Sequence, residues 1–163
     1  ERNAWFSDTW RGMQGKLQDI YSNERERSAA FPFELAYRLI NMFSVKNDLV
    51  LDPFLGTGTT TKAAICSQRN SIGFELSEGL SELIEKEILE SKEFCNNHIT
   101  NRFISHSDFT TERINSGKEV KHKLINHNYS CVSLQESKIL INNISEIRQS
   151  SGTFTVNYEK LID

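Results

Sequence analysis

The sequence contains little proline, few cysteines and no surplus of positive charge. Its 163 residues include two prolines, Pro32 and Pro53, so no Pro-Pro pair occurs. The three cysteines, Cys66, Cys95 and Cys131, form no C-x-x-C pair, which argues against a disulfide scaffold and a zinc ribbon. Lys and Arg number 19 against 22 Asp and Glu, a net charge of −3. This balance excludes a free-standing, sequence-independent nucleic-acid binder, which needs a basic surplus to displace counterions.

Long apolar runs and a targeting signal are also missing. No stretch approaches the roughly 20 apolar residues that a helix needs to span a bilayer. The chain starts at Glu1 rather than Met, and the residues that follow do not form a signal peptide. We therefore expect a cytoplasmic protein that makes no membrane contact and is part of a longer polypeptide.

Apolar spacing predicts an alternation of helices and strands from residue 33 onward. Helices are expected over 33–44, over 59–68 and from Ser77 to about residue 88. Strands are expected over 48–51, over 71–74 and around Phe103-Ile104, the last ending near Asp108. This order is typical of an α/β fold with a parallel sheet flanked by helices. Further on, Leu140, Ile141, Ile144 and Ile147 suggest a short helix, and residues 153–156 alternate like an edge strand.

The chain divides into three regions on this reading. Residues 1–30 have no clear period and are expected to form a connector or arm. Residues 31–110 form the α/β core, and residues 111–163 a C-terminal extension of the same domain. In the first region, packing against the core is the more frequent role for Trp5 and Trp10, although the nearby arginines leave a DNA-facing role open.

The most informative segment is 52–60, which reads Asp-Pro-Phe-Leu-Gly-Thr-Gly-Thr-Thr. It combines a strand end, a tight glycine loop and a helix N-terminus. Gly56 and Gly58 let the backbone approach a ligand closely, and the helix end offers free N–H groups. Glu75 stands at the tip of the next strand, where a carboxylate can accept two hydrogen bonds from a ribose diol. The pattern therefore predicts a nucleoside-containing cofactor across the carboxyl ends of a parallel sheet.

Two common phosphate-binding loops fit this segment poorly. A dinucleotide fingerprint requires a third glycine at position 61, where this chain has Thr61. A P-loop requires Gly-Lys-Ser/Thr, which does not follow. A nicotinamide-dependent oxidoreductase is therefore disfavoured.

The segment 52–60 resembles the S-adenosylmethionine-binding motif of amino-group DNA methyltransferases, which act on exocyclic adenine or cytosine nitrogens. The stretch from Phe31 to Ile40 resembles the segment that precedes this motif and closes over the methionine end, and 72–76 resembles the ribose-binding strand. The resemblance implies a Rossmann-like S-adenosylmethionine-dependent methyltransferase fold with a partial parallel sheet. It extends to Asp108, where the family often places an acidic residue near the adenine amine. The residues assigned to cofactor binding are Phe31, Pro32, Asp52, Pro53, Phe54, Gly56, Thr57, Gly58, Thr59, Thr60, Glu75 and Asp108.

The order of these parts resembles the permuted branch of the family, whose catalytic loop and target-recognition region precede the cofactor half. That loop is Asp-, Asn- or Ser-Pro-Pro followed by an aromatic residue, and no Pro-Pro occurs here. The resemblance thus implies no catalytic residue in this chain, double-stranded DNA as substrate, and an upstream fragment or second subunit that carries the catalytic loop. The alternative is a non-catalytic S-adenosylmethionine-binding remnant or regulatory module.

Other polar clusters carry weaker signals. His98, His106, His122 and His127, with Cys95, invite a metal site, but no second ligand pair stands at the required spacing. Surface positions are therefore expected for these histidines, and no metal. The lysines of 118–123 surround Glu119 and are expected to form a solvated face rather than a phosphate site.

Overall fold

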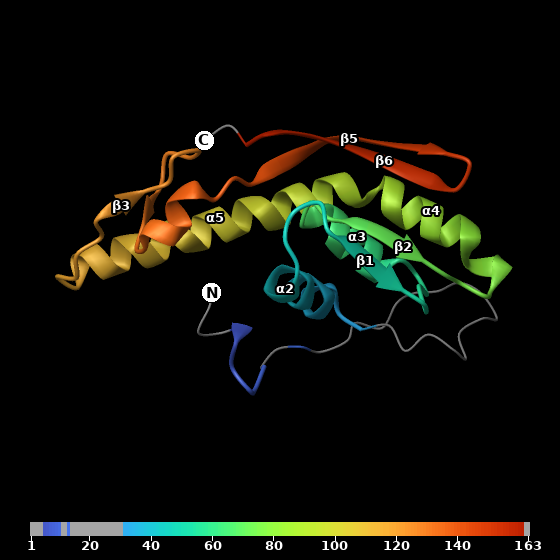
Figure 1. Ribbon diagram of the computed structural model, residues 1–163, viewed down its shortest axis with the longest axis horizontal. Helices are drawn as coiled ribbons and strands as arrows, with labels where there is room; N and C mark the ends of the chain where they lie inside the picture. Colours follow the sequence, from blue (N-terminus) through green and yellow to red (C-terminus); the bar gives the residue numbers. More distant parts are fainter. Residues whose placement is uncertain (1–4, 11–12, 14–30, 162–163) are drawn as a thin grey trace. The chain divides into compact units, whose positions relative to one another are not determined.

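The computed structural model describes residues 5–10, 13 and 31–161, which belong to two compact units, Glu1–Ser91 and Lys92–Asp163 (Figure 1). The boundary expected at residue 110 falls inside a helix of the second unit instead. Most of the expected connector over residues 1–30 lies outside the described residues.

The first unit alternates helices with two short strands. Its elements are α2 (Phe33–Phe43), β1 (Leu49–Asp52), α3 (Thr59–Cys66), β2 (Asn70–Gly73), η2 (Glu78–Leu80) and α4 (Ser81–Leu89). Strands β1 and β2 pair in parallel, with Leu51 opposite Ile72 and Asp52 opposite Gly73. The predicted helices over 33–44 and 59–68 and strands over 48–51 and 71–74 are confirmed with small shifts at their ends. The result is a mixed α/β unit built on a short parallel sheet.

Helix α3 lies at the centre of this unit, in contact with both strands, α2 and α4. Ala63 and Ala64 are fully buried, and these small side chains let the helix approach its neighbours closely. The amide of Asn41 in α2 donates to the Ser67 hydroxyl at 2.8 Å and ties α2 to the end of α3. The strands therefore meet a fixed helical layer on one face.

The described tryptophans pack on α2. The Trp5 ring meets Tyr37 edge-on, with ring centroids 6.1 Å apart. The Trp10 indole donates to the Trp5 carbonyl at 2.8 Å, and the Arg38 guanidinium lies over the Trp10 ring at 5.7 Å. The packing role expected as the more frequent one for Trp5 and Trp10 is therefore observed.

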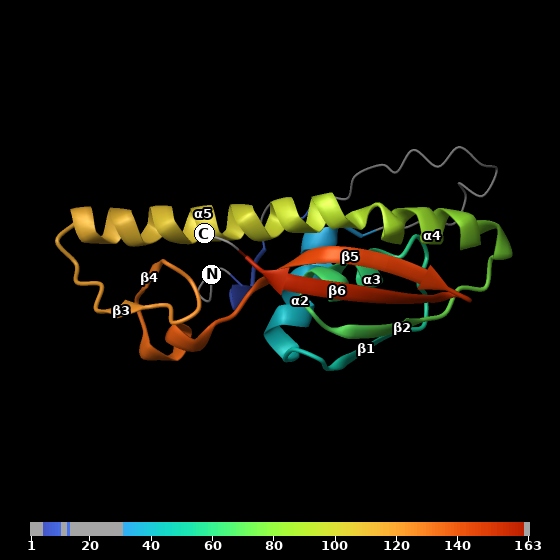
Figure 2. The same ribbon diagram turned by 90° about the horizontal axis from the view of Figure 1, so that it is seen from above.

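The second unit combines a long helix with two antiparallel strand pairs (Figure 2). Its elements are α5 (Ser91–Asn115), β3 (His122–Lys123), β4 (Ser130–Cys131), η3 (Leu134–Lys138), β5 (Asn142–Ser150) and β6 (Thr153–Lys160). The β5–β6 hairpin turns at Ser151 and Gly152, whose φ angles are 49° and 72°. Two positive φ values in a two-residue turn match the right-handed twist of the flanking strands. The strand expected over 153–156 is confirmed as part of β6.

The strand expected around Phe103-Ile104 is wrong, because these residues lie within α5. Cys95, Ile99 and Phe103 are buried at four-residue spacing, which is the repeat of one helix face. The Phe103 ring packs against His127 and Tyr129, with centroids 4.7 and 5.3 Å away. A buried stripe of this length favours a helix over a two-residue strand. Within the described ranges, no helix combines the length and apolar composition that a membrane crossing requires.

The helix expected from Leu140 to Ile147 is also wrong, because this segment leads into β5. A β-bulge interrupts the pairing between Ile144 and Glu146, so Ile144 lies opposite Tyr158 and Ile147 opposite Val156. The extra residue brings Ile144 and Ile147 to the same face of the hairpin. Their spacing of three, typical of a helix, is thus produced by a bulged strand.

Candidate functional site

The carboxyl end of β1 runs directly into the glycine loop. The side chain of Asp52 accepts a hydrogen bond from the Phe54 N–H at 3.0 Å and closes a tight turn. The Leu55 N–H donates to the Phe74 carbonyl at 2.8 Å, and the Phe74 N–H donates to the Asp52 carbonyl at 2.9 Å. These bonds hold the start of the loop against the end of β2.

The two glycines of the loop have left-handed backbone conformations, with φ of 56° at Gly56 and 85° at Gly58. A Cβ at Gly56 would meet only the Phe54 carbonyl oxygen, at 3.9 Å. A Cβ at Gly58 would instead touch Ile84 and Ile88 of α4, at 3.7 to 3.8 Å. Gly56 therefore offers room for the close approach of a ligand, whereas Gly58 serves the turn and the packing of α4.

Glu75 reaches the loop from the end of β2. Its Oε2 accepts a hydrogen bond from the Gly56 N–H at 2.8 Å, and its Oε1 accepts one from the Ser77 N–H at 2.8 Å. The side chain is exposed, and each carboxylate oxygen has a second lone pair for a further donor. The structure thus brings Glu75 and the glycine loop together, as the sequence predicts.

The site also holds an acceptor and donors suited to a ligand. The Oδ2 atom of Asp52 is buried and has no hydrogen-bond partner among the described residues. Helix α3 starts after Gly58 without a side-chain cap, so its first backbone N–H groups point out of the helix end. Thr57 is buried, and Thr59 and Thr60 are partly buried in the first turn of α3. An acceptor beside amide donors fits a ligand that carries both a cation and an anion.

The sequence pattern assigns no role to Leu55, whereas the structure shows its side chain packed against Gly73 of β2. A Cβ at Gly73 would lie 2.6 Å from the Leu55 side chain. Gly73 therefore makes room for Leu55 to pack on β2, which fixes the loop from its inner side. Gly73, the residue directly before Phe74, is the sequence signal that identifies this contact.

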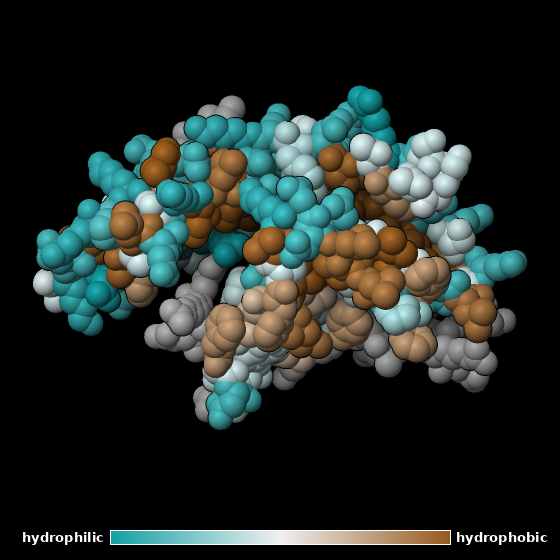
Figure 3. Space-filling view, in the orientation of Figure 1, coloured by the Kyte–Doolittle hydropathy of each residue, from teal (hydrophilic) through white to brown (hydrophobic). Residues whose placement is uncertain are grey.

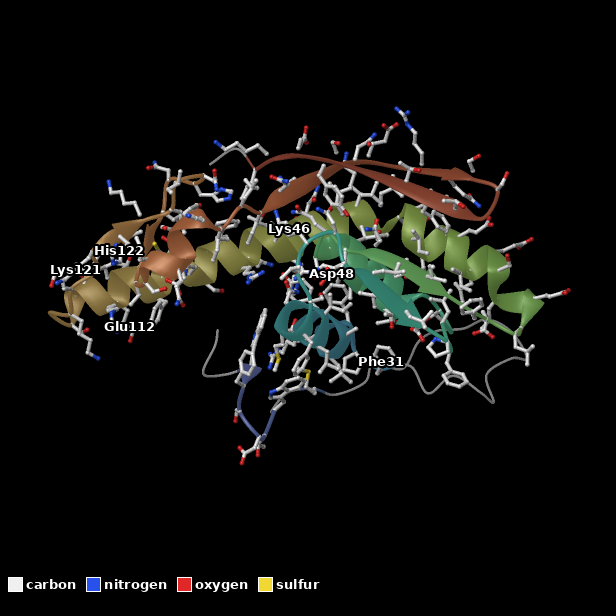
Figure 4. All side chains as sticks on the ribbon, viewed as in Figure 1. Phe31, Lys46, Asp48, Glu112, Lys121 and His122 are labelled. Atoms are coloured by element: carbon white, nitrogen blue, oxygen red, sulfur yellow. The ribbon has the colours of Figure 1, made fainter. Side chains whose placement is uncertain are left out.

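The other residues predicted to bind the cofactor lie partly in the first unit and partly in the second. Pro32 is the N-cap of α2, and Phe31 is exposed just before it (Figure 4), while Pro53 and Phe54 are exposed in the loop. Asp108 is exposed on α5 in the second unit. Its expected position at the end of a third strand is wrong, so the structure supplies no reason to place it beside the adenine amine.

At the amino ends of the two strands, polar side chains hold the loop that precedes β1. The carboxylate of Asp48 accepts a hydrogen bond from the Val45 N–H at 2.7 Å, and the Arg69 guanidinium donates to the carbonyl of Ser44 at 2.7 Å. Burial, and then the charge of Arg69, lower the pKa of Lys46 in the same loop (Figure 4). The polar side chains here are used to close the turn before β1.

The four histidines, expected on the surface, are buried or half-buried, whereas Lys118, Lys121 and Lys123 are exposed. His127 is buried rather than on the surface, and its Nε2 accepts a hydrogen bond from the Ile141 N–H at 3.1 Å. Lys121 pairs with Glu119 at 2.9 Å on an exposed face. In the part of the chain that the structure describes, no three His, Cys, Asp or Glu side chains gather as a metal site requires.

Comparison with known proteins matches this chain to one family. The N6/N4 methyltransferase family, described as DNA methylase, matches residues 1–86. The chain is 46% identical over 140 residues to the type II methyltransferase M.MthZI of Methanothermobacter thermautotrophicus, covering 85% of this chain and 38% of that protein. It is 53% identical over 88 residues to the type II methyltransferase M.MjaI of Methanocaldococcus jannaschii, covering 54% of this chain and 28% of that protein.

A solved structure is also similar over part of the chain. A DNA modification methylase of Thermus thermophilus, crystallised with S-adenosyl-L-methionine, is 36% identical with a TM-score of 0.46, and the match covers 55% of this chain and 32% of that one. The chain spans between a quarter and two fifths of the length of the two curated relatives above. Because the family match covers more than half of its residues, the chain belongs to the N6/N4 DNA methylase family.

Proposed function

We propose that this chain is the S-adenosylmethionine-binding part of a site-specific DNA methyltransferase that acts on the exocyclic amine of adenine or cytosine. The proposal rests on the hydrogen bond that Glu75 accepts from the Gly56 N–H at the carboxyl ends of two parallel strands. Ligands of open α/β sheets bind outside these ends. In this proposal the two strands are the beginning of a Rossmann-like methyltransferase sheet, and the protein acts in the cytoplasm.

The chemistry of the loop fits the cofactor. The Glu75 carboxylate retains acceptor capacity for the ribose hydroxyls, and the open side of Gly56 admits the ligand close to the backbone. The orphaned Oδ2 of Asp52 suits a positively charged group, and the first amides of α3 suit a carboxylate. When bound, S-adenosylmethionine supplies a methyl group on a positively charged sulfur. Phe31, Pro32, Pro53, Phe54 and the threonines 57, 59 and 60 complete the proposed contact set.

The acceptor side of the reaction requires residues that this chain lacks. Methyl transfer needs the amine lone pair aligned with the methyl–sulfur bond, and the target base must leave the helix stack to reach it. In the family that this chain resembles, a Pro-Pro-aromatic loop holds the amine, and the two prolines here are not adjacent. We therefore assign the donor half to this chain and the acceptor loop and target recognition to another segment or subunit.

The experiment measures transfer of a labelled methyl group from S-adenosylmethionine to duplex DNA. Purified chain alone is expected to transfer none. Addition of the segment of M.MthZI that lies outside the matched 140 residues is expected to restore transfer, because that protein is similar over most of this chain. Methylation by the chain alone would refute the assignment of the acceptor loop to another segment or subunit. Cofactor binding without transfer in the mixture would favour a non-catalytic binding module.

A further inference from the structure

The segment that joins α5 to β3 carries a local surplus of positive charge. Residues 116–123 read Ser-Gly-Lys-Glu-Val-Lys-His-Lys. They hold three lysines and one glutamate, a net charge of 3 − 1 = +2, whereas the whole chain has −3. We call these eight residues the lysine loop. Glu112 and Arg113 in the last turn of α5 cancel one another, so the helix end leaves this surplus unchanged.

The structure fixes the lysine loop at both ends. The Lys118 N–H donates to the Arg113 carbonyl at 3.0 Å, which is the long bond of a Schellman motif at the end of α5. Gly117 supplies the left-handed backbone that this motif requires, with a φ of 74°. At the other end, Lys123 pairs with Ser130 in the β3–β4 ladder. The backbone therefore determines where the lysines stand.

The lysines are directed to solvent. Side chains alternate along an extended segment, so Lys121 and Lys123 lie on one side of it and His122 on the other. Exposure agrees with this, because Lys118, Lys121 and Lys123 are exposed and His122 is half-buried. Figure 4 shows Lys121 and His122 at the end of α5 that carries Glu112, and Figure 3 shows hydrophilic side chains gathered over this end of the second unit. The fold thus presents an exposed basic surface.

Most of this positive charge is available to a ligand. Lys121 pairs with Glu119 at 2.9 Å, and both side chains are exposed. Lys118 and Lys123 take part in no ion pair among the described residues. At 0.1 M ionic strength the Debye length is about 10 Å, so exposed charges farther away are largely screened. The local surplus, rather than the net charge of the chain, therefore decides what this surface attracts.

The lysine loop lies outside the cofactor-binding core. The family match ends at residue 86, before the second unit begins. The first unit holds 91 of the 163 residues, and the match to M.MthZI covers 85% of the chain. That match therefore extends into the second unit, so a type II methyltransferase shares part of it. A role in the same reaction, apart from cofactor binding, is the natural one to test.

We propose that the lysine loop contacts the phosphate backbone of the duplex DNA substrate, an inference that rests on the proposed function above. Duplex DNA carries one negative charge per 1.7 Å of its axis, the dense anionic surface that exposed lysines attract. Lysine contacts phosphates as a point charge, which positions the duplex without reading its sequence. The loop contains no aromatic residue on which the bases of a single strand would stack. Target recognition thus remains with residues outside this chain.

The β5–β6 hairpin provides a matched comparison in the same unit. Arg148 is an exposed cation, but Glu146 pairs with it at 2.7 Å. This pair offers no net charge to a phosphate. Arg148→Ala therefore removes one exposed positive charge from the second unit and leaves the lysine loop intact.

The test measures binding of the full chain to a short fluorescein-labelled DNA duplex by fluorescence anisotropy, from about 50 to about 200 mM salt. Lys118→Ala and Lys123→Ala each remove one unpaired charge, Glu119→Gln removes the acidic residue of the loop, and Arg148→Ala is the control. A second duplex of unrelated sequence tests sequence dependence. Circular dichroism measures folding, and calorimetry with S-adenosylmethionine measures the cofactor site.

Each lysine variant is expected to bind both duplexes about tenfold more weakly at about 50 mM salt. The slope of log affinity against log salt is expected to become less steep by about one in each. Glu119→Gln is expected to strengthen binding, because it removes a negative charge and releases Lys121. Arg148→Ala is expected to bind as the wild type does.

Absence of duplex binding by the wild type would overturn the proposal, as would equal losses in the lysine variants and in Arg148→Ala. Tighter binding of an RNA duplex of the same length would overturn it in favour of RNA. A wild type that binds DNA through the lysines but does not bind S-adenosylmethionine would contradict the proposed function and uphold the DNA contact. Cofactor binding without duplex binding would leave the proposed function standing and remove this one.

Discussion

The carboxylate of Glu75 accepts a hydrogen bond from the backbone N–H of Gly56 at 2.8 Å. The bond joins the end of β2 to the loop after β1, although α3 separates these segments in the chain. The second oxygen of the same carboxylate holds the Ser77 N–H and thereby the turn before η2. One side chain thus fixes both strand ends at the proposed cofactor site.

Replacement of Glu75 by alanine is expected to weaken S-adenosylmethionine binding by roughly 1.5–3 kcal/mol, about 10- to 150-fold, because charge-assisted hydrogen bonds are lost. The loop also loses its tie to Gly56. Calorimetric titration measures the change, and Glu78→Ala, an exposed carboxylate at the start of η2, is the matched control. Unchanged affinity in Glu75→Ala would remove the ribose assignment.

Replacement of Gly56 by alanine tests whether the open side of the loop receives a ligand. The added methyl group meets little protein but fills the space beside the backbone, so binding is expected to fall at least tenfold. The backbone strain of φ 56° alone costs about 1 kcal/mol of stability. Gly117→Ala is the control, because its φ is 74° and no atom lies within 4 Å of its Cβ. A similar loss of cofactor affinity in both variants would assign the effect to strain.

The sequence predicts the first unit well because its signals are local. The apolar run before Asp52, the two glycines after it and Glu75 at the next strand end each act within a few residues. Helix α2 shows its apolar face directly, with Ala36, Tyr37 and Ile40 buried. The sequence does not predict the hydrogen bond that the Glu75 carboxylate accepts from the Gly56 N–H. The sequence places the two residues together but does not reveal that the carboxylate also supports the loop.

The second unit is predicted less well because its elements depend on distant contacts. Phe103 and Ile104 are an apolar pair, but Phe103 is buried by His127 and Tyr129 on a helix face. Ile144 and Ile147 have helical spacing, yet a bulge explains it. A bulge depends on the partner strand, so it is not visible in the spacing of one segment. The four-residue repeat from Cys95 to Phe103 is the signal that would have identified α5.

Asn96 is expected to hold the hairpin of the second unit onto α5. Its side chain accepts a hydrogen bond from the Ile144 N–H at 2.8 Å and donates to the Ile144 carbonyl at 3.0 Å. Asn96→Ala is expected to reduce the free energy of unfolding by about 1–3 kcal/mol, because the backbone groups of the buried Ile144 lose these partners. Urea denaturation measures this, with Asn101→Ala, an exposed position on α5, as control. Equal stability of the two variants would contradict the assigned role.

The exposed pair of Glu146 and Arg148 predicts a small pH dependence in the hairpin. The hydrogen bond from Arg148, at 2.7 Å, lowers the pKa of Glu146, and its charge adds to the effect. A carboxyl whose pKa is lower in the folded state adds stability above its ordinary pKa and loses this contribution as the pH falls through the folded pKa. In Arg148→Ala, NMR titration of Glu146 is expected to show a higher pKa. An unchanged or lower midpoint would contradict the pairing.

Calorimetric titration of the purified chain with S-adenosylmethionine, with NAD as the comparison ligand, tests the central claim most directly. The glycine loop, the orphaned Asp52 oxygen and Glu75 predict saturable binding of one S-adenosylmethionine per chain and no saturable heat with NAD. A folded chain that shows no saturable binding of S-adenosylmethionine, or that binds NAD in its place, would contradict the account.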